Sequence, residues 1–123
     1  MIAYYSNVTK NTERFVAKTG LPSVRIEESI PEDCILVIPT YGQAAIPVEV
    51  LKRLQRREDR DKIRGVIGTG NINFGSNYCA GATQLAARLG VPLLYTLELA
   101  GTDHDVRTVI DIYERALLRA LVA

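Results

Sequence analysis

Five short runs of mainly apolar residues recur along the chain, and each predicts a β-strand. These runs cover residues 2–5, 23–26, 34–38, 63–69 and 92–99. The run 34–38, which begins at Cys34, is apolar at every position. A continuous apolar run of this kind is typical of a central strand that is covered on both faces.

Segments with helical periodicity separate these runs. We expect helices over residues 11–19, from Pro47 onward, over 78–89, and from Thr102 to about residue 121. Thr102 and Asp105 have the spacing of a capping box, which predicts the start of the last helix. In the second helix, the predicted apolar stripe consists of Val48, Leu51 and Leu54, and the predicted solvent side of Arg53, Arg56 and Arg57.

The order of these elements predicts one α/β domain over residues 1–123. Strands that alternate with helices form a parallel sheet, with helices on both faces and right-handed crossovers. In doubly wound sheets of this type, ligands bind at the carboxyl ends of the strands, near the point where the strand order reverses. The loops after the first, third and fourth strands are therefore the candidate ligand-binding segments.

Composition and charge exclude several classes of function. The chain has 123 residues and a formal net charge of +1, so it lacks the basic field that would indicate nucleic-acid binding. Two cysteines and one histidine are too few for a disulfide framework or a zinc site, and we predict no metal site. We expect Cys34 and Cys79 to be buried, and His104 to be exposed at the start of a helix.

The amino-terminal residues and the apolar runs also bear on location. Polar Ser6 and Asn7 follow the first apolar run too soon for a signal peptide. No apolar run approaches the ~20 residues that a transmembrane helix needs. We therefore expect a cytoplasmic protein.

The first candidate loop carries groups that suit a phosphate. It consists of Ser6, Asn7, Val8, Thr9, Lys10, Asn11 and Thr12. Its hydroxyls, amides and backbone N–H groups lie between a strand and a helix N-terminus, where unpaired N–H groups and the helix dipole attract anions. An ordinary polar turn with an N-cap would have the same composition, so this loop alone does not decide between the two interpretations.

The second candidate loop, residues 39–47, places an aromatic ring at the end of the central strand. It begins with Pro39, Thr40, Tyr41 and Gly42. Tyr41 can lie against a flat ligand, and Gly42 allows the backbone to approach that ligand or to turn a peptide toward it. The alternative is a tyrosine that only covers the edge of the sheet.

The third candidate loop is rich in glycine and asparagine. It contains Gly70, Asn71, Asn73, Phe74 and Gly75, and Tyr78 follows it. The segment lacks the third glycine of the dinucleotide-binding fingerprint. Its backbone N–H groups and amides instead suit the polar edge of an isoalloxazine ring, with Phe74 or Tyr78 near the ring face, and Gly70 can turn its peptide toward the ring.

Together, the loops resemble those of the NrdI family, which consists of short flavodoxin-like proteins that activate class Ib ribonucleotide reductase. The resemblance rests on Ser6-x-x-Thr9-x-Asn11-Thr12, Pro39-Thr40-Tyr41-Gly42, Gly70-Asn71-x-Asn73-Phe74-Gly75 and Glu98-Leu99-x-Gly101-Thr102. It covers nearly the whole chain, in order. Two positions depart from the family pattern: Lys10 stands where the phosphate loop usually has glycine, and Ile72 where the family often has arginine.

The resemblance implies a flavodoxin-like sheet with strand order 2-1-3-4-5 and FMN as the cofactor, held by the three loops. It also implies a redox activator that has no catalytic side chain of its own. Reduced FMN and O₂ would supply superoxide, or electrons, for the dimanganese–tyrosyl radical cofactor in the small subunit of class Ib ribonucleotide reductase. An unidentified reductase would be the electron donor.

Two other functions are compatible with the same architecture. A general flavodoxin-type electron carrier is expected to have acidic residues around the flavin, and residues 6–12, 39–47 and 70–78 contain none. A binding module without flavin is the second alternative.

The absence of carboxylates from these loops also bears on the reduction potentials of a bound flavin. Nearby carboxylates would disfavour the anionic hydroquinone that two-electron reduction produces. Without them, we expect the second electron to enter the flavin at a potential close to that of the first.

Overall fold

The predicted five-stranded parallel sheet is present in the computed structural model, which describes residues 1–6, 9–40, 46–71, 73, 75 and 78–122. Of residues 117, 118 and 120–122 it describes the backbone alone. The strands are β1 (Ile2–Tyr4), β2 (Ser23–Arg25), β3 (Cys34–Pro39), β4 (Ile63–Gly70) and β5 (Leu93–Glu98). All paired strands are parallel, and their order is β2-β1-β3-β4-β5. The flavodoxin-like order 2-1-3-4-5 is therefore confirmed.

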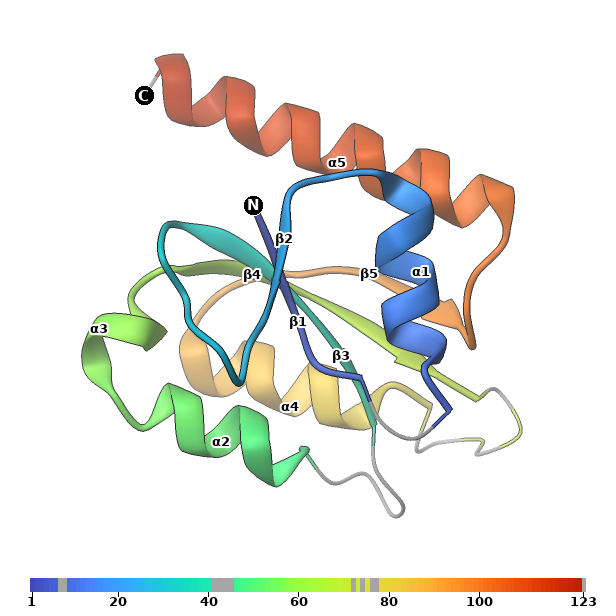
Figure 1. Ribbon diagram of the computed structural model, residues 1–123, viewed down its shortest axis with the longest axis horizontal. Coiled ribbons are helices and arrows are strands. Elements are labelled where there is room, and N and C mark those ends of the chain that lie inside the picture. The colour runs from blue at the N-terminus through green and yellow to red at the C-terminus, as the bar shows by residue number, and fades with distance from the viewer. Residues whose placement is uncertain (7–8, 41–45, 72, 74, 76–77, 123) are drawn as a thin grey trace.

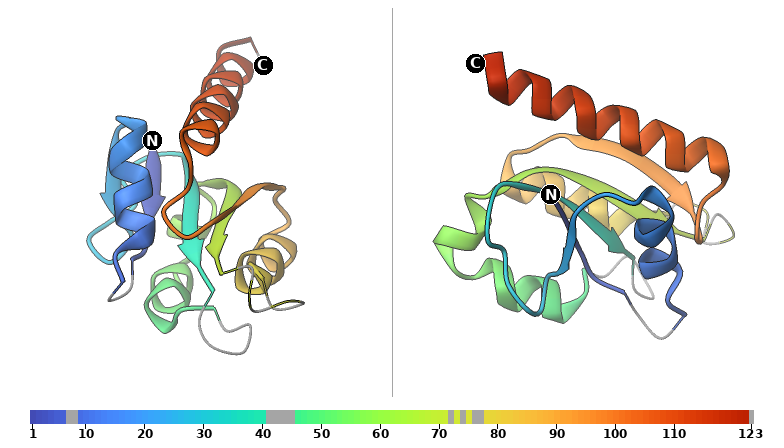
Figure 2. Two further views of the ribbon diagram at one scale, coloured as in Figure 1. Left: turned by 90° about the vertical axis from the view of Figure 1, so that its right-hand side faces the viewer. Right: turned by 45° about the horizontal axis from the view of Figure 1, so that its top comes forward.

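Helices cover both faces of this sheet. They are α1 (Asn11–Thr19), α2 (Val48–Leu54), α3 (Arg57–Arg60), α4 (Ala80–Leu89) and α5 (Asp103–Val122). Figures 1 and 2 show α1 and α5 on one face, and α2, α3 and α4 on the other. None of the helices in the described part of the chain is long and apolar enough to cross a membrane.

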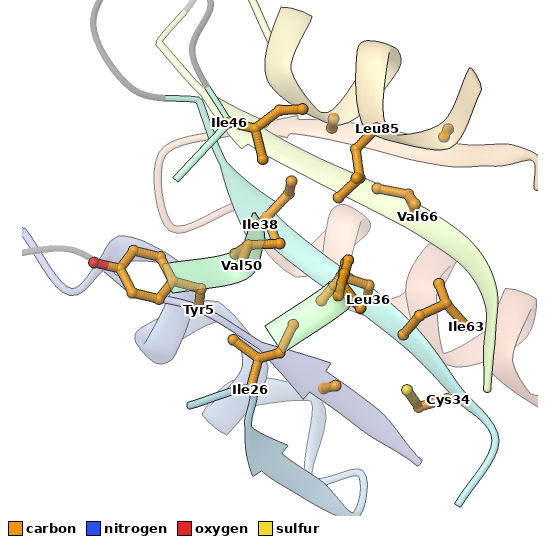
Figure 3. Close-up of a cluster of buried hydrophobic side chains, with 14 of the residues drawn as sticks. Tyr5, Ile26, Cys34, Leu36, Ile38, Ile46, Val50, Ile63, Val66 and Leu85 are labelled. Carbon is orange, nitrogen blue, oxygen red and sulfur yellow. The ribbon is translucent and has the colours of Figure 1, made fainter. Parts of the chain in front are cut away.

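Each face of the sheet has its own layer of buried side chains. Toward α2 and α4, Leu36 and Ile38 of β3 pack with Val50 and Leu85, as Figure 3 shows. Toward α1 and α5, Val37 of β3 joins the second cluster of buried residues, which also contains Ile2, Phe15, Val16, Ile35, Ile67, Leu97 and Val109. All six residues of β3 are buried, which confirms the prediction of a central strand.

The predicted orientation of the second helix is right at Leu54 and wrong at Val48 and Arg53. Val50 and Leu54 are its buried residues, whereas Val48 is 55% exposed. Arg53, which was expected on the solvent side, donates hydrogen bonds to the carbonyl oxygens of Ile26 at 2.8 Å and Glu27 at 2.5 Å. After β2 the chain leaves these two carbonyl oxygens facing α2. The long Arg53 side chain reaches them, so it turns toward the protein and not toward solvent.

The charged segment after α2 is more ordered than its composition indicates. Residues 57–60 form the short helix α3. Asp59 is buried, with its Oδ2 atom 3.8 Å from Arg53 and 3.9 Å from Arg56. A buried carboxylate needs such cationic neighbours to offset its loss of hydration.

Smaller sequence predictions about single residues are confirmed. The Asp105 backbone N–H donates to Thr102 Oγ1, and the Thr102 N–H donates to Asp105 Oδ2, which forms the capping box of α5. Cys34 and Cys79 are buried free thiols, and His104 is exposed. Burial raises the pKa of the Cys34 thiol to about 11, so it remains protonated at neutral pH.

The turn between β5 and α5 depends on glycine at position 101. Gly101 has a φ of +74°, and a Cβ atom there would lie 2.7 Å from Cδ1 of the buried Phe15. We expect Gly101→Ala to lower the free energy of unfolding by about 2–4 kcal/mol, because left-handed strain and overpacking add. The matched control is Gly90→Ala, where φ is +69° and nothing lies within 4 Å of the new Cβ.

The free energy of unfolding of Gly90→Ala should fall by only about 1 kcal/mol, because this variant suffers backbone strain without overpacking. Urea unfolding of both variants measures the difference. Equal losses would contradict the packing of this turn against α1.

Candidate functional site

The carboxyl ends of β1, β3 and β4 meet at one edge of the sheet. Pro39, the last residue of β3, pairs with Thr69 of β4, and Tyr4, the last residue of β1, pairs with Val37 of β3. The strand ends from which the three candidate loops start therefore lie at the same edge of the sheet (Figure 1). Five residues of the predicted site lie outside the described residues: Asn7, Val8, Tyr41, Gly42 and Phe74.

In the first loop, side-chain oxygens point toward the start of α1. Ser6 Oγ accepts a hydrogen bond from the Glu13 backbone N–H at 3.3 Å, and Thr9 Oγ1 accepts one from the Asn11 N–H at 3.4 Å. The N-cap residue of α1 is Lys10, whose side chain makes no capping hydrogen bond. This helix therefore begins with a cation at its cap position, where an acceptor side chain is usual.

Lys10 has a left-handed backbone, with φ of 60° and ψ of 18°. A non-glycine residue costs about 1–2 kcal/mol in this conformation. The position thus requires the geometry that glycine adopts most readily, and the chain places an exposed lysine there. The departure from the family pattern noted in the sequence is a real source of backbone strain.

The Thr12 side chain is buried and contacts β4. Its Oγ1 atom is 2.8 Å from Thr69 Oγ1, and both residues are 2% exposed. This hydrogen bond joins the first turn of α1 to the end of β4. Since the two residues are 57 positions apart, sequence spacing gave no sign of the contact.

The described part of the second loop caps a helix. Thr40 Oγ1 accepts a hydrogen bond from the Gly81 backbone N–H at 3.1 Å, and Thr40 is buried. Pro39 belongs to β3, although the sequence predicted that it would follow the strand. The end of β3 is therefore fixed to the N-terminus of α4.

In the third loop, Asn71 Oδ1 accepts a hydrogen bond from the Asn73 N–H at 2.9 Å, and Gly75 has a φ of +59°. Tyr78 packs close to Gly70, where a Cβ atom would lie 3.3 Å from the tyrosine Cδ1. Burial, with smaller contributions from its neighbours, raises the pKa of Tyr78 to about 12. The Tyr78 side chain is therefore uncharged at neutral pH where it packs against this loop.

The Gly70 carbonyl is not free to turn. It accepts a hydrogen bond from the Leu99 N–H at 2.8 Å, which continues the pairing of Gly70 with Glu98. The sequence expectation that Gly70 could turn its peptide toward a ligand conflicts with this bond. Of the two glycines considered for that role, Gly42 remains, outside the described residues.

In the sequence, Glu98 and Leu99 belong only to the family resemblance, but in the structure both border the start of the third loop at Gly70. Leu99 is 43% exposed and has a φ of 54°. Among the described residues, the non-glycine positions with positive φ are Lys10, Cys79 and Leu99, and all three lie at this edge. Strained backbone of this kind concentrates at functional sites.

The donor set at this edge suits a phosphate monoester. The described residues from 6 to 12 offer hydroxyls, an amide and the Lys10 ammonium, and none is acidic. The nearby Glu13 carboxylate is drawn away by Arg25, whose Nη1 lies 3.0 Å from Glu13 Oε1. Within the described ranges, no cluster of histidine, cysteine or acidic residues could hold a metal ion.

A hollow lies at the opposite edge of the sheet. It has a volume of about 510 Å³, and its walls include Met1, Asp33, Arg64, Leu94 and Tyr113. The Asp33 carboxylate there is paired with Arg64 at 2.9 Å. Although large enough for a small molecule, this groove lies far from the three loops and lacks their serine and threonine side chains.

Comparison with known proteins agrees with this geometry. A family model described as NrdI flavodoxin-like matches residues 3–111. The protein NrdI of Bartonella tribocorum is 44% identical over 124 residues, which cover 94% of each chain. The NrdI of Rhizobium etli is 42% identical over 125 residues, covering 94% of this chain and 93% of the relative.

A solved structure supports the fold alone. A short-chain flavodoxin associated with a bacterial microcompartment superposes with a TM-score of 0.63 at 15% sequence identity, covering 92% of each chain. The family model matches the sequence itself over residues 3–111, and the NrdI relatives share about two fifths of its residues. The chain therefore belongs to the NrdI flavodoxin-like family.

Proposed function

We propose that this protein binds FMN and activates class Ib ribonucleotide reductase. In this role it supplies superoxide, or electrons, for assembly of the dimanganese–tyrosyl radical cofactor in the reductase small subunit. The observation that carries the proposal is the meeting of three loops, typical of the NrdI family in sequence, at the carboxyl edge of a flavodoxin-like sheet. That edge is where such sheets bind their ligands.

The first loop would hold the phosphate of FMN. Ser6, Thr9, Asn11 and Thr12 offer neutral donors there, Lys10 offers a positive charge, and Asn7 and Val8 belong to the same proposed contact. The N-terminus of α1 adds backbone N–H groups and the positive end of its dipole. FMN carries one terminal phosphate, which matches a single loop of this type.

The second and third loops would hold the ring system. The proposed contacts are Pro39, Thr40, Tyr41, Gly42, Gly70, Asn71, Asn73, Phe74, Gly75 and Tyr78. Bound FMN would supply the redox chemistry, by passing electrons from a reductase to O₂. The chain itself orients the ring, restricts water, and keeps neutral groups such as Tyr78 next to it.

The first test of this function concerns the identity of the ligand. Purified protein should be yellow and should release FMN in about a one-to-one ratio, because one monophosphate-sized loop adjoins the ring site. Chromatography of the released flavin measures this. Release of FAD, or an absorption spectrum without flavin after incubation with FMN, would contradict the proposal.

A second experiment tests activation directly. The metal-free small subunit is loaded with Mn²⁺ and mixed with the FMN-bound protein, a reductant and O₂. We expect a tyrosyl radical in the electron paramagnetic resonance spectrum, together with ribonucleotide reductase activity. The control replaces the protein with the same concentration of free FMN. A radical yield no higher than in that control would reject the proposed role while leaving FMN binding intact.

A third test separates charge from strain at Lys10. Lys10→Gly should raise the free energy of unfolding by about 1 kcal/mol, since glycine relieves the left-handed backbone at some entropic cost. Lys10→Glu keeps the strain and reverses the charge. We expect both variants to bind FMN more weakly, and the glutamate variant more so, because a cation near a phosphate strengthens binding.

Urea unfolding and fluorescence titration with FMN measure the two effects in the same proteins. Tighter FMN binding by both variants would mean that strain outweighs charge. Lys10 would then oppose ligand binding.

A further inference from the structure

A buried pair of hydroxyl groups connects two of the loops that border the site. Thr12 lies in the first turn of α1, directly after the first loop, and Thr69 lies directly before Gly70, where β4 ends. Their Oγ1 atoms are 2.8 Å apart, and either can be the donor. Because β3 lies between β1 and β4, this bond ties the first loop to a strand that is not its neighbour in the sheet.

The pair has one proton more than its own hydrogen bond uses. Two hydroxyls carry two O–H protons, and the bond between them consumes one. In the part of the chain that the structure describes, neither side chain makes another hydrogen bond. One buried O–H group therefore has no acceptor among the described residues, and leaving such a donor unpaired is costly unless a ligand supplies the acceptor.

The surroundings decide which hydroxyl faces a ligand. Thr69 is held in the sheet between Pro39 of β3 and Leu97 of β5, and neither of those side chains offers an acceptor. Thr12 adjoins the loop of Ser6, Thr9 and Lys10, which suits an anion. We therefore assign the donor in the pair to Thr69, whose O–H points to Thr12 Oγ1. The O–H of Thr12 is then the one that can donate to a ligand.

We propose that Thr69 is a positioning residue for the FMN phosphate. Its hydroxyl donates to Thr12 Oγ1, so the Thr12 proton is turned toward the phosphate. A negative charge polarises such a chain of hydroxyls in this direction and strengthens both bonds. This inference rests on the proposed binding of FMN and adds a residue that does not contact the ligand.

The test compares FMN with riboflavin, which has the same ring but no phosphate. Apo-protein is titrated with each flavin, and quenching of flavin fluorescence gives the dissociation constants. Thr69→Val should weaken FMN binding about 3- to 10-fold, the range of one ordinary hydrogen bond, and should change riboflavin binding by less than about twofold. Thr69→Ser, which keeps the hydroxyl, should restore FMN binding.

A matched control removes a buried hydroxyl from the other end of the same helix. Thr19 Oγ1 donates to the Val16 carbonyl at 2.6 Å, and Thr19 is buried. Thr19→Val should lower the stability of the apo-protein without changing the ratio of FMN to riboflavin affinity. Urea unfolding of each apo-variant checks that it is folded.

Three results would overturn the inference. These are an equal loss of FMN and riboflavin binding in Thr69→Val, unchanged FMN binding in that variant, and failure of Thr69→Ser to restore it. Wild-type protein that binds neither flavin would instead reject the proposed function, and the inference with it. The wild-type constants and the variant ratios therefore test the two proposals separately.

Discussion

The structure depends on the complete burial of β3. All six of its residues are buried, and its side chains alternate between the two apolar layers of the molecule. Hydrogen bonds to β1 and β4 hold its backbone from both sides. Because the middle strand cannot shift without disrupting both layers, the carboxyl ends of its neighbours are fixed relative to one another. The points at which the three loops leave the sheet are fixed in the same way.

Polar contacts then lock the edge where these strands end. Thr12 bonds to Thr69, Thr40 caps α4, and the Leu99 N–H holds the Gly70 carbonyl. These bonds connect strands and helices that are distant in the sequence. The rigid frame and the strained positions Lys10, Cys79 and Leu99 occur together, as is common where a protein holds a ligand in a set orientation.

The spacing of apolar residues along the chain predicted the main helices and strands well. The bounds of α1 and the central position of β3 are as expected, since a helical stripe and a continuous apolar run are strong local signals. The orientation of α2 was predicted correctly at Leu54 but not at Arg53, which turns inward because it donates to the Ile26 and Glu27 carbonyls. Local patterns cannot show an acceptor that only tertiary structure provides.

The candidate site was predictable in composition and less so in geometry. The hydroxyl- and glycine-rich loops stand out in the sequence, and topology brings them together. The Thr12–Thr69 bond and the pairing of Gly70 with Glu98 could not be predicted, because each joins residues from separate elements. The sequence shows that Lys10 stands where the phosphate loop usually has glycine, and the structure shows that its backbone is left-handed.

Hydrogen exchange of the backbone amides, measured with and without FMN, tests the central claim most directly. The claim is that FMN binds where β1, β3 and β4 end. We expect FMN to slow exchange in residues 6–13, 39–47 and 69–78, and to leave the groove around Met1, Asp33 and Arg64 unchanged. Slower exchange confined to that groove, or no change at the three loops, would contradict it.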